Sequence, residues 1–171
     1  MTYQWEDRER AFIAQRYDRI AGLIGLFDRL LFLPSHLRRR AAARLSLKPG
    51  ERVLEIGCGT GRNFPFLREA VGPAGKIYGV DLSSGMLRRA RTLCGREQWE
   101  NVELTQCDAL EYIPCEPLDG IMFGLCYNTM PHQRSCAMRG GTCVLAAASS
   151  SWTASFPTAA AASSHCPSGS G

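Results

Sequence analysis

The sequence predicts an α/β protein in which helices wrap a mostly parallel sheet. Two observations predict this class. Short apolar stretches alternate along the chain with amphipathic helical segments, which is typical of a parallel sheet covered by helices. The first of these stretches, "VLEIG", runs directly into a glycine-rich turn, as a buried strand does when its backbone must turn sharply.

Length and charge set the frame for this prediction. A chain of 171 residues is expected to form one domain with a substantial core. The net charge of +4 is modest, so it does not by itself call for a nucleic-acid partner, and none is expected. All 16 acidic residues lie at or before Asp119, which leaves the C-terminal part unlike the rest.

The cysteines and the N-terminus suggest a cytoplasmic protein. The eight cysteines are scattered, with no CxxC pair and no metal-ligand spacing, so we expect reduced thiols and no metal site. Charged residues at 6–10 occupy the place where a signal peptide needs an apolar run. The apolar stretch at 20–34 is interrupted by Asp28 and Arg29, and is too short and too charged to span a bilayer.

The elements are expected in the following order. Apolar residues spaced by three and four predict helix over 6–45, broken at Pro34 and Ser35, after which "SHLRRRAAARL" forms a basic helix. The strand ending in "VLEIG" comes next. We then expect a helix at 61–71, a strand at 76–81, a helix at 83–95, a strand at 101–107, a helical turn near 109–113 and a strand at 118–126.

The glycine loop and one aspartate suggest a nucleoside site. Gly57, Gly59 and Gly61 allow close approach of a ligand to the backbone, and the amides of the next helix would face an anionic group. Asp81 follows about 20 positions later at the end of a strand, where a carboxylate can accept hydrogen bonds from ribose hydroxyls. Each observation has an alternative interpretation. The glycines could form a purely structural turn, and Asp81 could cap the next helix, a role that Ser83 could equally fill.

The loop spacing argues against a dinucleotide. A dinucleotide loop follows G-x-G-x-x-G/A, with a small residue at position 62. This chain carries Arg62 there and follows G-x-G-x-G instead. An NAD-dependent oxidoreductase is therefore disfavoured.

Four stretches together resemble the successive motifs of class I S-adenosylmethionine-dependent methyltransferases. They are "VLEIGCGTGRN", "GVDLSSGML", "QCDALEYIP" and "LDGIMFGLCYN". In addition, "YDRIAGLIGLFDRLLF" is similar to the opening helix of the ubiquinone/menaquinone and phospholipid methyltransferase branch, so the likeness runs from Tyr17 to His132. The resemblance implies a Rossmann-like fold and S-adenosyl-L-methionine as the cofactor.

The resemblance also implies a role for each matching residue. The methionine part of the cofactor would lie along Gly57, Gly59, Thr60 and Gly61, and Asp81 would hold the ribose. The adenine would lie near Leu82 and Met86, with contacts from Asp108 and Ala109. The sulfonium would lie over Phe123 and Gly124, and Tyr17 would close the pocket, with a packing role as the alternative.

The acceptor side is less defined by the sequence. Methyl transfer from a sulfonium needs orientation more than acid–base help, so no catalytic residue is required. Tyr127 and His132 follow the fourth strand and are weak candidates for a general base, with a simple loop role as the alternative. The arginine runs at 38–40 and 88–91 are interpreted as solvated helix faces. The apolar 20–33 segment leaves open a small-molecule or lipid-like acceptor and peripheral membrane contact.

The C-terminal stretch does not fit the rest. Of the 38 residues from Arg134 onward, 18 are Ala or Ser, and the helix and fifth strand of the family pattern are not recognisable after His132. Reading each codon one base early from Ser135 permits "VLRDAWRHVRPGGRLVVMDGKLP", which does fit that pattern. We therefore predict a frameshifted tail, with a natural Ala/Ser-rich disordered tail as the alternative.

Three parts and two functional hypotheses follow. Residues 1–46 would cap the cofactor site, 47–133 would form the cofactor-binding core, and 134–171 would be an aberrant, disordered tail. The sheet would then end at the fourth strand, leaving an exposed apolar edge. The chain is predicted to methylate an acceptor, and the alternative is an inactive remnant that binds cofactor weakly or not at all.

Overall fold

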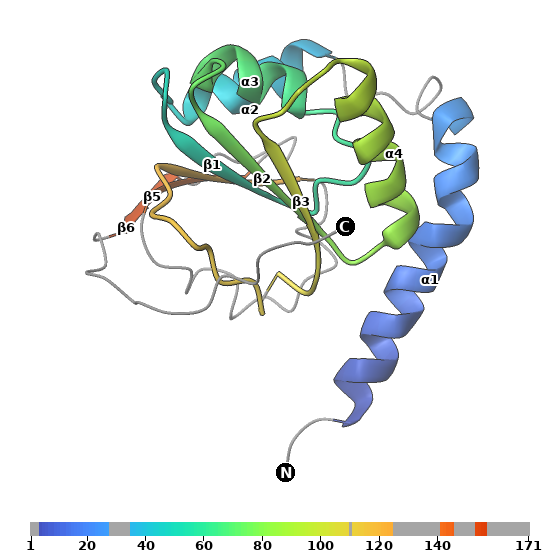
Figure 1. The fold of residues 1–171 in the computed structure, drawn as a ribbon. Coiled ribbons are helices and arrows are strands. Elements are labelled where there is room, and N and C mark those ends of the chain that lie inside the picture. Colours follow the sequence, from blue (N-terminus) through green and yellow to red (C-terminus); the bar gives the residue numbers. More distant parts are fainter. Residues whose placement is uncertain (1–3, 28–34, 110, 125–140, 146–152, 157–171) are drawn as a thin grey trace.

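The fold is an open sheet with helices packed against it (Figure 1). The computed structural model describes residues 4–27, 35–109, 111–124, 141–145 and 153–156. The helices are α1 (Gln4–Phe27), α2 (Ser35–Arg44), α3 (Phe64–Val71) and α4 (Ser84–Arg96). The strands are β1 (Arg52–Ile56), β2 (Lys76–Asp81), β3 (Val102–Gln106), β4 (Gly120–Phe123), β5 (Gly141–Leu145) and β6 (Thr153–Phe156). The predicted α/β class is confirmed.

The strand order places β1 at the centre of the sheet. The order is β3-β2-β1-β4-β5-β6, and every pair is parallel except β5 with β6. The chain moves outward in one direction from β1 through β2 to β3, and β4 then returns to the other side of β1. In such sheets ligands bind outside the carboxyl ends of the strands where the order reverses. Here that point lies between β1 and β4.

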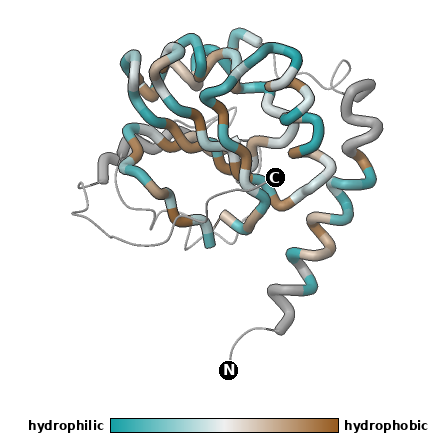
Figure 2. The backbone as a smooth tube through the Cα atoms, viewed as in Figure 1, coloured by the Kyte–Doolittle hydropathy of each residue, from teal (hydrophilic) through white to brown (hydrophobic). Residues whose placement is uncertain are grey.

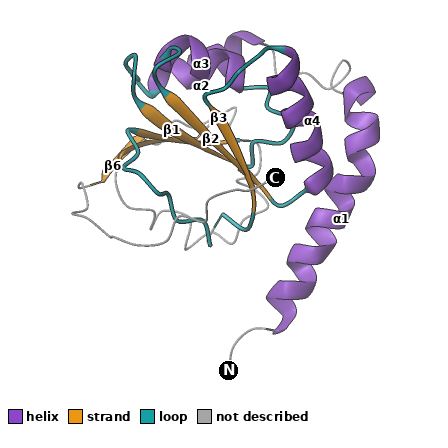
Figure 3. Ribbon diagram, in the orientation of Figure 1, coloured by secondary structure: helices purple, strands orange, loops and turns teal. Residues whose placement is uncertain are grey.

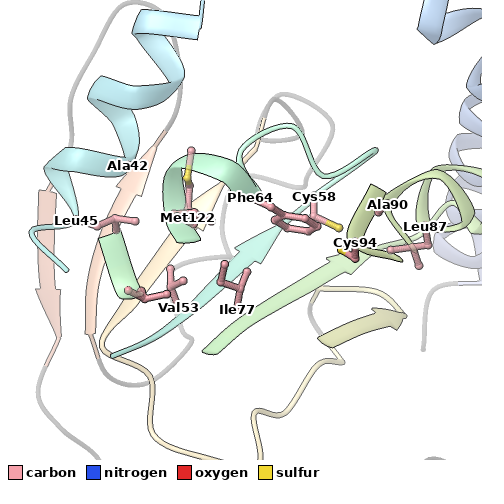
Figure 4. Packing of buried hydrophobic residues seen from close by; sticks show 12 residues of the cluster. Ala42, Leu45, Val53, Cys58, Phe64, Ile77, Leu87, Ala90, Cys94 and Met122 are labelled. Carbon is pink, nitrogen blue, oxygen red and sulfur yellow. The ribbon is translucent and has the colours of Figure 1, made fainter. Parts of the chain in front are cut away.

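Side chains that alternate along the strands divide the core into two layers. Val53, Ile77 and Met122 face α2, α3 and α4, and pack with Phe64 and Leu87 (Figure 4). The opposite face of the sheet buries a second cluster, formed by Leu54, Ile56, Tyr78, Val80, Ala109, Leu118, Ile121 and Phe123. Figure 2 shows the hydrophobic residues concentrated along the strands. Burial on both faces explains why these strands read as continuous apolar runs.

Helix α1 runs beside α4 and lies apart from α2 and α3 (Figure 3). It does not join the layer formed by α2 and α3 over the sheet. Its half-buried and exposed positions follow the helical period over residues 10–20. The N-terminal helix therefore packs against α4, and Arg10 extends its contacts to Asp108 after β3.

The helix and strand predictions agree with the structure in order and type. The predicted break at Pro34 and Ser35 falls between α1 and α2, and β2 has the predicted bounds. Helix α3 begins at Phe64 rather than near residue 61, because Gly57, Gly59 and Gly61 take positive φ angles that a helix cannot use. Among the described residues, Cys58, Cys94, Cys107 and Cys115 are not joined by disulfides.

The sheet does not end at the fourth strand, as was expected from the sequence, but continues with two further strands. β5 pairs in parallel with β4, from Gly120 with Thr142 to Phe123 with Leu145, and β6 then pairs with β5. The expectation that no strand forms beside β4 is therefore wrong for residues 141–145. The segment "GTCVL" contains the β-formers Thr and Val, and the open edge of β4 offers backbone groups that an extended segment can satisfy. Apart from residues 141–145 and 153–156, the stretch 134–171 lies outside the described residues.

The frameshift stays a prediction, since it concerns the gene. In the shifted frame, "RLVVM" falls on positions 148–152 and supplies larger apolar and β-branched residues for a strand beside β4 than "GTCVL" does. We expect the frame-restored chain to melt several degrees higher than the present one. Sequencing the gene around codon 133 and comparing the two melting temperatures tests this. Equal melting temperatures would show that the present end is tolerated.

Candidate functional site

The loop after β1 is built by glycines in left-handed backbone conformations. Gly57, Gly59 and Gly61 have φ angles of 67°, 55° and 79°. The amides of Gly57 and Cys58 both donate to the carbonyl of Val80, at 2.7 and 3.1 Å, which ties the loop to the end of β2. A Cβ at Gly59 would meet nothing within 4 Å, so its left-handed φ is what favours glycine there. The loop therefore turns sharply over the ends of β1 and β2.

Gly124 brings the end of β4 against the same loop. Its amide donates to the carbonyl of Ile56 at 2.8 Å. A Cβ at this position would lie 2.4 Å from the carbonyl oxygen of Gly57, so the two backbones approach more closely than any other residue allows. The ends of β1 and β4 thus form one rigid unit at the point where the strand order reverses.

Asp81, at the end of β2, closes the third side of the loop. One carboxylate oxygen accepts from the amide of Gly59 at 2.8 Å, and the other accepts from the amide of Ser83 at 2.9 Å. Burial raises the pKa of Asp81, while these amides oppose the rise. The helix-cap alternative for Asp81 does not hold, because Ser83 caps α4 by accepting from the amide of Met86 at 3.1 Å.

A buried carboxyl joins the two ends of the loop. Glu55 is 1% exposed, and its Oε1 accepts from the side-chain amide of Asn63 at 2.6 Å. Asn63 in turn accepts from the Arg38 guanidinium at 3.0 Å. Burial raises the pKa of Glu55 to about 8, opposed by the Asn63 bond and the Arg38 charge. Its Oε2 is buried and has no hydrogen-bond partner among the described residues.

Helix α1 supplies charged side chains to the edge of this site. Asp18 accepts from the Ser83 hydroxyl at 2.5 Å and from the Gly85 amide at 2.8 Å. Those two bonds hold α1 against the N-terminus of α4, and they are the main reason that the pKa of Asp18 is lowered. Two turns earlier, Arg10 contacts Asp108 at 2.7 Å, beyond the end of β3.

The remaining predicted site residues fall into three groups. Thr60, Leu82 and Tyr17 are half-buried, on the loop, after β2 and on α1 respectively. The side chains of Met86, Ala109 and Phe123 are buried, and Ala109 and Phe123 belong to the cluster on the second face of the sheet. Tyr127 and His132 lie outside the described residues.

Metal centres and membrane spans have no candidate in the part of the chain that the structure describes. Within it, no cluster of three His, Cys, Asp or Glu side chains is arranged to hold a metal ion. No helix in the same part is both long enough and apolar enough to cross a membrane.

Sequence reasoning missed four polar residues of this region, Arg10, Asp18, Glu55 and Asn63. For Glu55 a signal existed, because a lone carboxyl in the buried strand "VLEI" requires a partner that offsets the cost of burying it. Asn63 stands directly after the glycine loop, where its side chain was within reach of that carboxyl. No local signal marks Arg10 or Asp18, because their partners lie far along the chain.

The sequence matches the family model described as methyltransferase domain over residues 53–146. This match continues past His132, where the resemblance was expected to end, and includes β5. The demethylmenaquinone methyltransferase of Geobacillus stearothermophilus is 29% identical over 120 residues, which cover 70% of this chain and 49% of that protein. The chain thus spans about half the length of the curated relatives it matches.

Solved structures share the fold. A SAM dependent methyltransferase from Aquifex aeolicus superposes with a TM-score of 0.57 at 23% identity, covering 68% of this chain and 69% of that one. One from Thiobacillus denitrificans, solved in complex with S-adenosyl-L-homocysteine, gives a TM-score of 0.55 at 22% identity, over 67% and 48% of the two chains. With the family model matching more than half of the sequence, this chain belongs to the methyltransferase domain family and has the class I methyltransferase fold.

Proposed function

We propose that this chain binds S-adenosyl-L-methionine at the carboxyl ends of β1, β2 and β4 and transfers its methyl group to a small-molecule or lipid-like acceptor. The observation that carries the proposal is the convergence of Asp81 on the glycine loop through the amide of Gly59. Family membership and the Thiobacillus denitrificans complex with S-adenosyl-L-homocysteine support the same cofactor.

The polar groups at the loop fit the two ends of such a cofactor. A carboxylate can accept about four hydrogen bonds. Asp81 accepts hydrogen bonds from the amides of Gly59 and Ser83, and the Leu82 amide also stabilises its charge, so capacity remains for a ribose hydroxyl. At the other end of the loop, the buried Oε2 of Glu55 fits a ligand that brings a positive charge, as the ammonium of a methionine group does. Thr60 and Gly61 would lie along the methionine part between these two carboxyls.

The adenine side follows from the elements after β2 and β3. Leu82 precedes α4, and Met86 lies in its first turn. Asp108 and Ala109 follow β3. We place the adenine between them, with Tyr17 of α1 closing the pocket. Domain boundaries at 46 and 133 go with this proposal, since residues 1–46 then cover a site formed by 47–133.

When bound, the cofactor supplies a methyl group on a sulfonium, which leaves without needing a proton. The protein is then left with orientation, which can account for roughly 7–11 kcal/mol of the barrier. Phe123 ends β4, Gly124 follows it directly, and the two would fix the position of the sulfur. The hydrogen bond that the Gly124 amide donates to the Ile56 carbonyl holds these two residues against the end of β1.

The acceptor class is suggested by the relatives. Those named demethylmenaquinone methyltransferases act, by name, on a demethylmenaquinone, so a quinol-like aromatic ring with an apolar tail is the acceptor class we propose. Tyr127 and His132 are the candidates for its general base.

Replacing Asp81 with Ala tests the cofactor site. Hydrogen bonds that ribose hydroxyls donate to a carboxylate are worth about 1.5–3 kcal/mol, so we expect binding of S-adenosylhomocysteine to weaken at least about tenfold. Titration calorimetry measures the affinity for S-adenosylhomocysteine, and NAD is titrated into the parent in a separate experiment. Glu103→Ala, which removes an exposed carboxylate on β3, is the control variant. Unchanged affinity in Asp81→Ala would contradict the ribose placement, and NAD binding would contradict the cofactor.

A further inference from the structure

One face of α1 is turned toward the proposed adenine region. Arg10, Ile13, Ala14 and Tyr17 are half-buried, and they recur at spacings of three and four. The residues between them on the helix surface are exposed, with Phe12 65% exposed. Over residues 10–20 these four residues form the half-buried stripe of α1, and Arg10 is the charged member of that stripe.

Two polar contacts hold this face in place. Asp18 binds the Ser83 hydroxyl and the Gly85 amide, at the start of α4. Arg10 binds Asp108, with 2.7 Å between Nε and Oδ2, after the end of β3. Eight residues of helix span about 12 Å, so α1 bridges from the end of β2 to the end of β3. The nucleoside in our proposed site would lie along that edge.

The guanidinium of Arg10 contacts two carboxylates. Its Nε contacts Asp108, and its Nη1 donates to Glu111 at 2.7 Å. The Asp108 side chain is 14% exposed and that of Glu111 63%. The pair with Asp108 is thus the better shielded from water, and a planar guanidinium fixes the orientation of the carboxylate it contacts.

We propose that Arg10 is a positioning residue that makes the site select a 6-aminopurine nucleoside over a 6-oxopurine one. Asp108 is the group that would accept from the adenine amino group, and this inference rests on the proposed function. A carboxylate offers only acceptors, about four of them, so contact with Arg10 does not use up its capacity for hydrogen bonds. Held in one orientation, it favours an amino group and disfavours the carbonyl oxygen of a 6-oxopurine. Released from Arg10, it can turn away, and the selection weakens.

The experiment compares two ligands on the full chain. S-adenosylhomocysteine carries the amino group, and its deaminated analogue S-inosylhomocysteine carries a carbonyl in its place. We expect the parent to prefer the first by about tenfold or more, since a bond to a charged group is lost with the second. In Arg10→Gln the preference should fall to about threefold or less, and Arg10→Lys should restore part of it. Arg16→Gln, on the exposed side of the same helix, should keep the parental preference.

The possible outcomes distinguish failure of this inference from failure of the proposed function. A preference lost in Arg10→Gln while the melting temperature and the effect of Asp81→Ala are retained supports the inference. Equal weakening of both ligands in Arg10→Gln would overturn it, because Arg10 would then only hold the helix in place. Failure of the parent to bind either ligand would overturn the proposed function, and this inference with it.

Discussion

Replacing Gly124 with Ala is expected to lower the free energy of unfolding by about 2–4 kcal/mol. The added Cβ would lie 2.4 Å from the carbonyl oxygen of Gly57 and 3.3 Å from that of Ile56. Both obstacles are backbone atoms at the end of the central strand, so neither can move aside as a flexible side chain does. To relieve the clash, β4 must move away from β1 and weaken the bond from the Gly124 amide to Ile56.

Gly95→Ala is the matched control for this change. Gly95 lies in α4, and a Cβ there would meet nothing within 4 Å. Alanine favours helix over glycine by up to about 1 kcal/mol, so this variant should be as stable as the parent or more stable. Denaturant unfolding of the two variants then compares the same added methyl group with and without the close approach.

The same variant reports on the proposed site. Displacing the end of β4 shifts Gly57 as well, so S-adenosylhomocysteine binding should fall at least about tenfold in Gly124→Ala, measured below its unfolding midpoint. Binding by Gly95→Ala should match the parent. A Gly124→Ala protein with parental stability would contradict the close approach of β1 and β4.

The fold was predictable because its signals are local. Apolar runs such as "KIYGVD", ended by glycine or aspartate, mark buried strands, and Pro34 marks the break between the first two helices. The fifth strand was not predictable on the same grounds. Its pairing with β4 depends on an open edge, which is a property of the assembled sheet, and the Ala/Ser-rich composition around "GTCVL" hides it.

The site was predictable only in the part that follows strand ends. The glycines and Asp81 stand where the chain leaves β1 and β2, so their meeting follows from a parallel sheet. The position of α1 does not follow from any pattern. Arg10 meets Glu111 across 101 positions, and only the folded chain shows that Asp108 has an arginine beside it. The role of Glu55 was not predictable either, because its strand reads as apolar and its partner Asn63 lies beyond the glycine loop.

Glu55 should also make stability depend on pH. Burial raises the pKa of Glu55 in the folded chain to about 8, against an ordinary value of 4.5. Below pH 4.5 the carboxyl is protonated in both states, and its contribution to stability is complete. Between these two values the folded chain keeps a proton that the unfolded chain has released. The free energy of unfolding therefore falls by about 1.4 kcal/mol for each pH unit in that window, and levels off above pH 8.

Glu55→Gln should remove that loss of stability. Glutamine keeps the acceptor for Asn63 and cannot ionise, so the variant should gain on the parent steadily from pH 5 to 8, by up to about 4 kcal/mol. Glu100→Gln, at an exposed position, is the control for removing one negative charge, and its difference from the parent should stay within about 0.5 kcal/mol. Unfolding in denaturant from pH 5 to 9 measures all three proteins. A constant difference between Glu55→Gln and the parent would mean that Glu55 is ionised in the folded chain throughout. The charge of Arg38, carried through Asn63, would then outweigh burial, and the carboxyl beneath the glycine loop would be an anion before any ligand arrives.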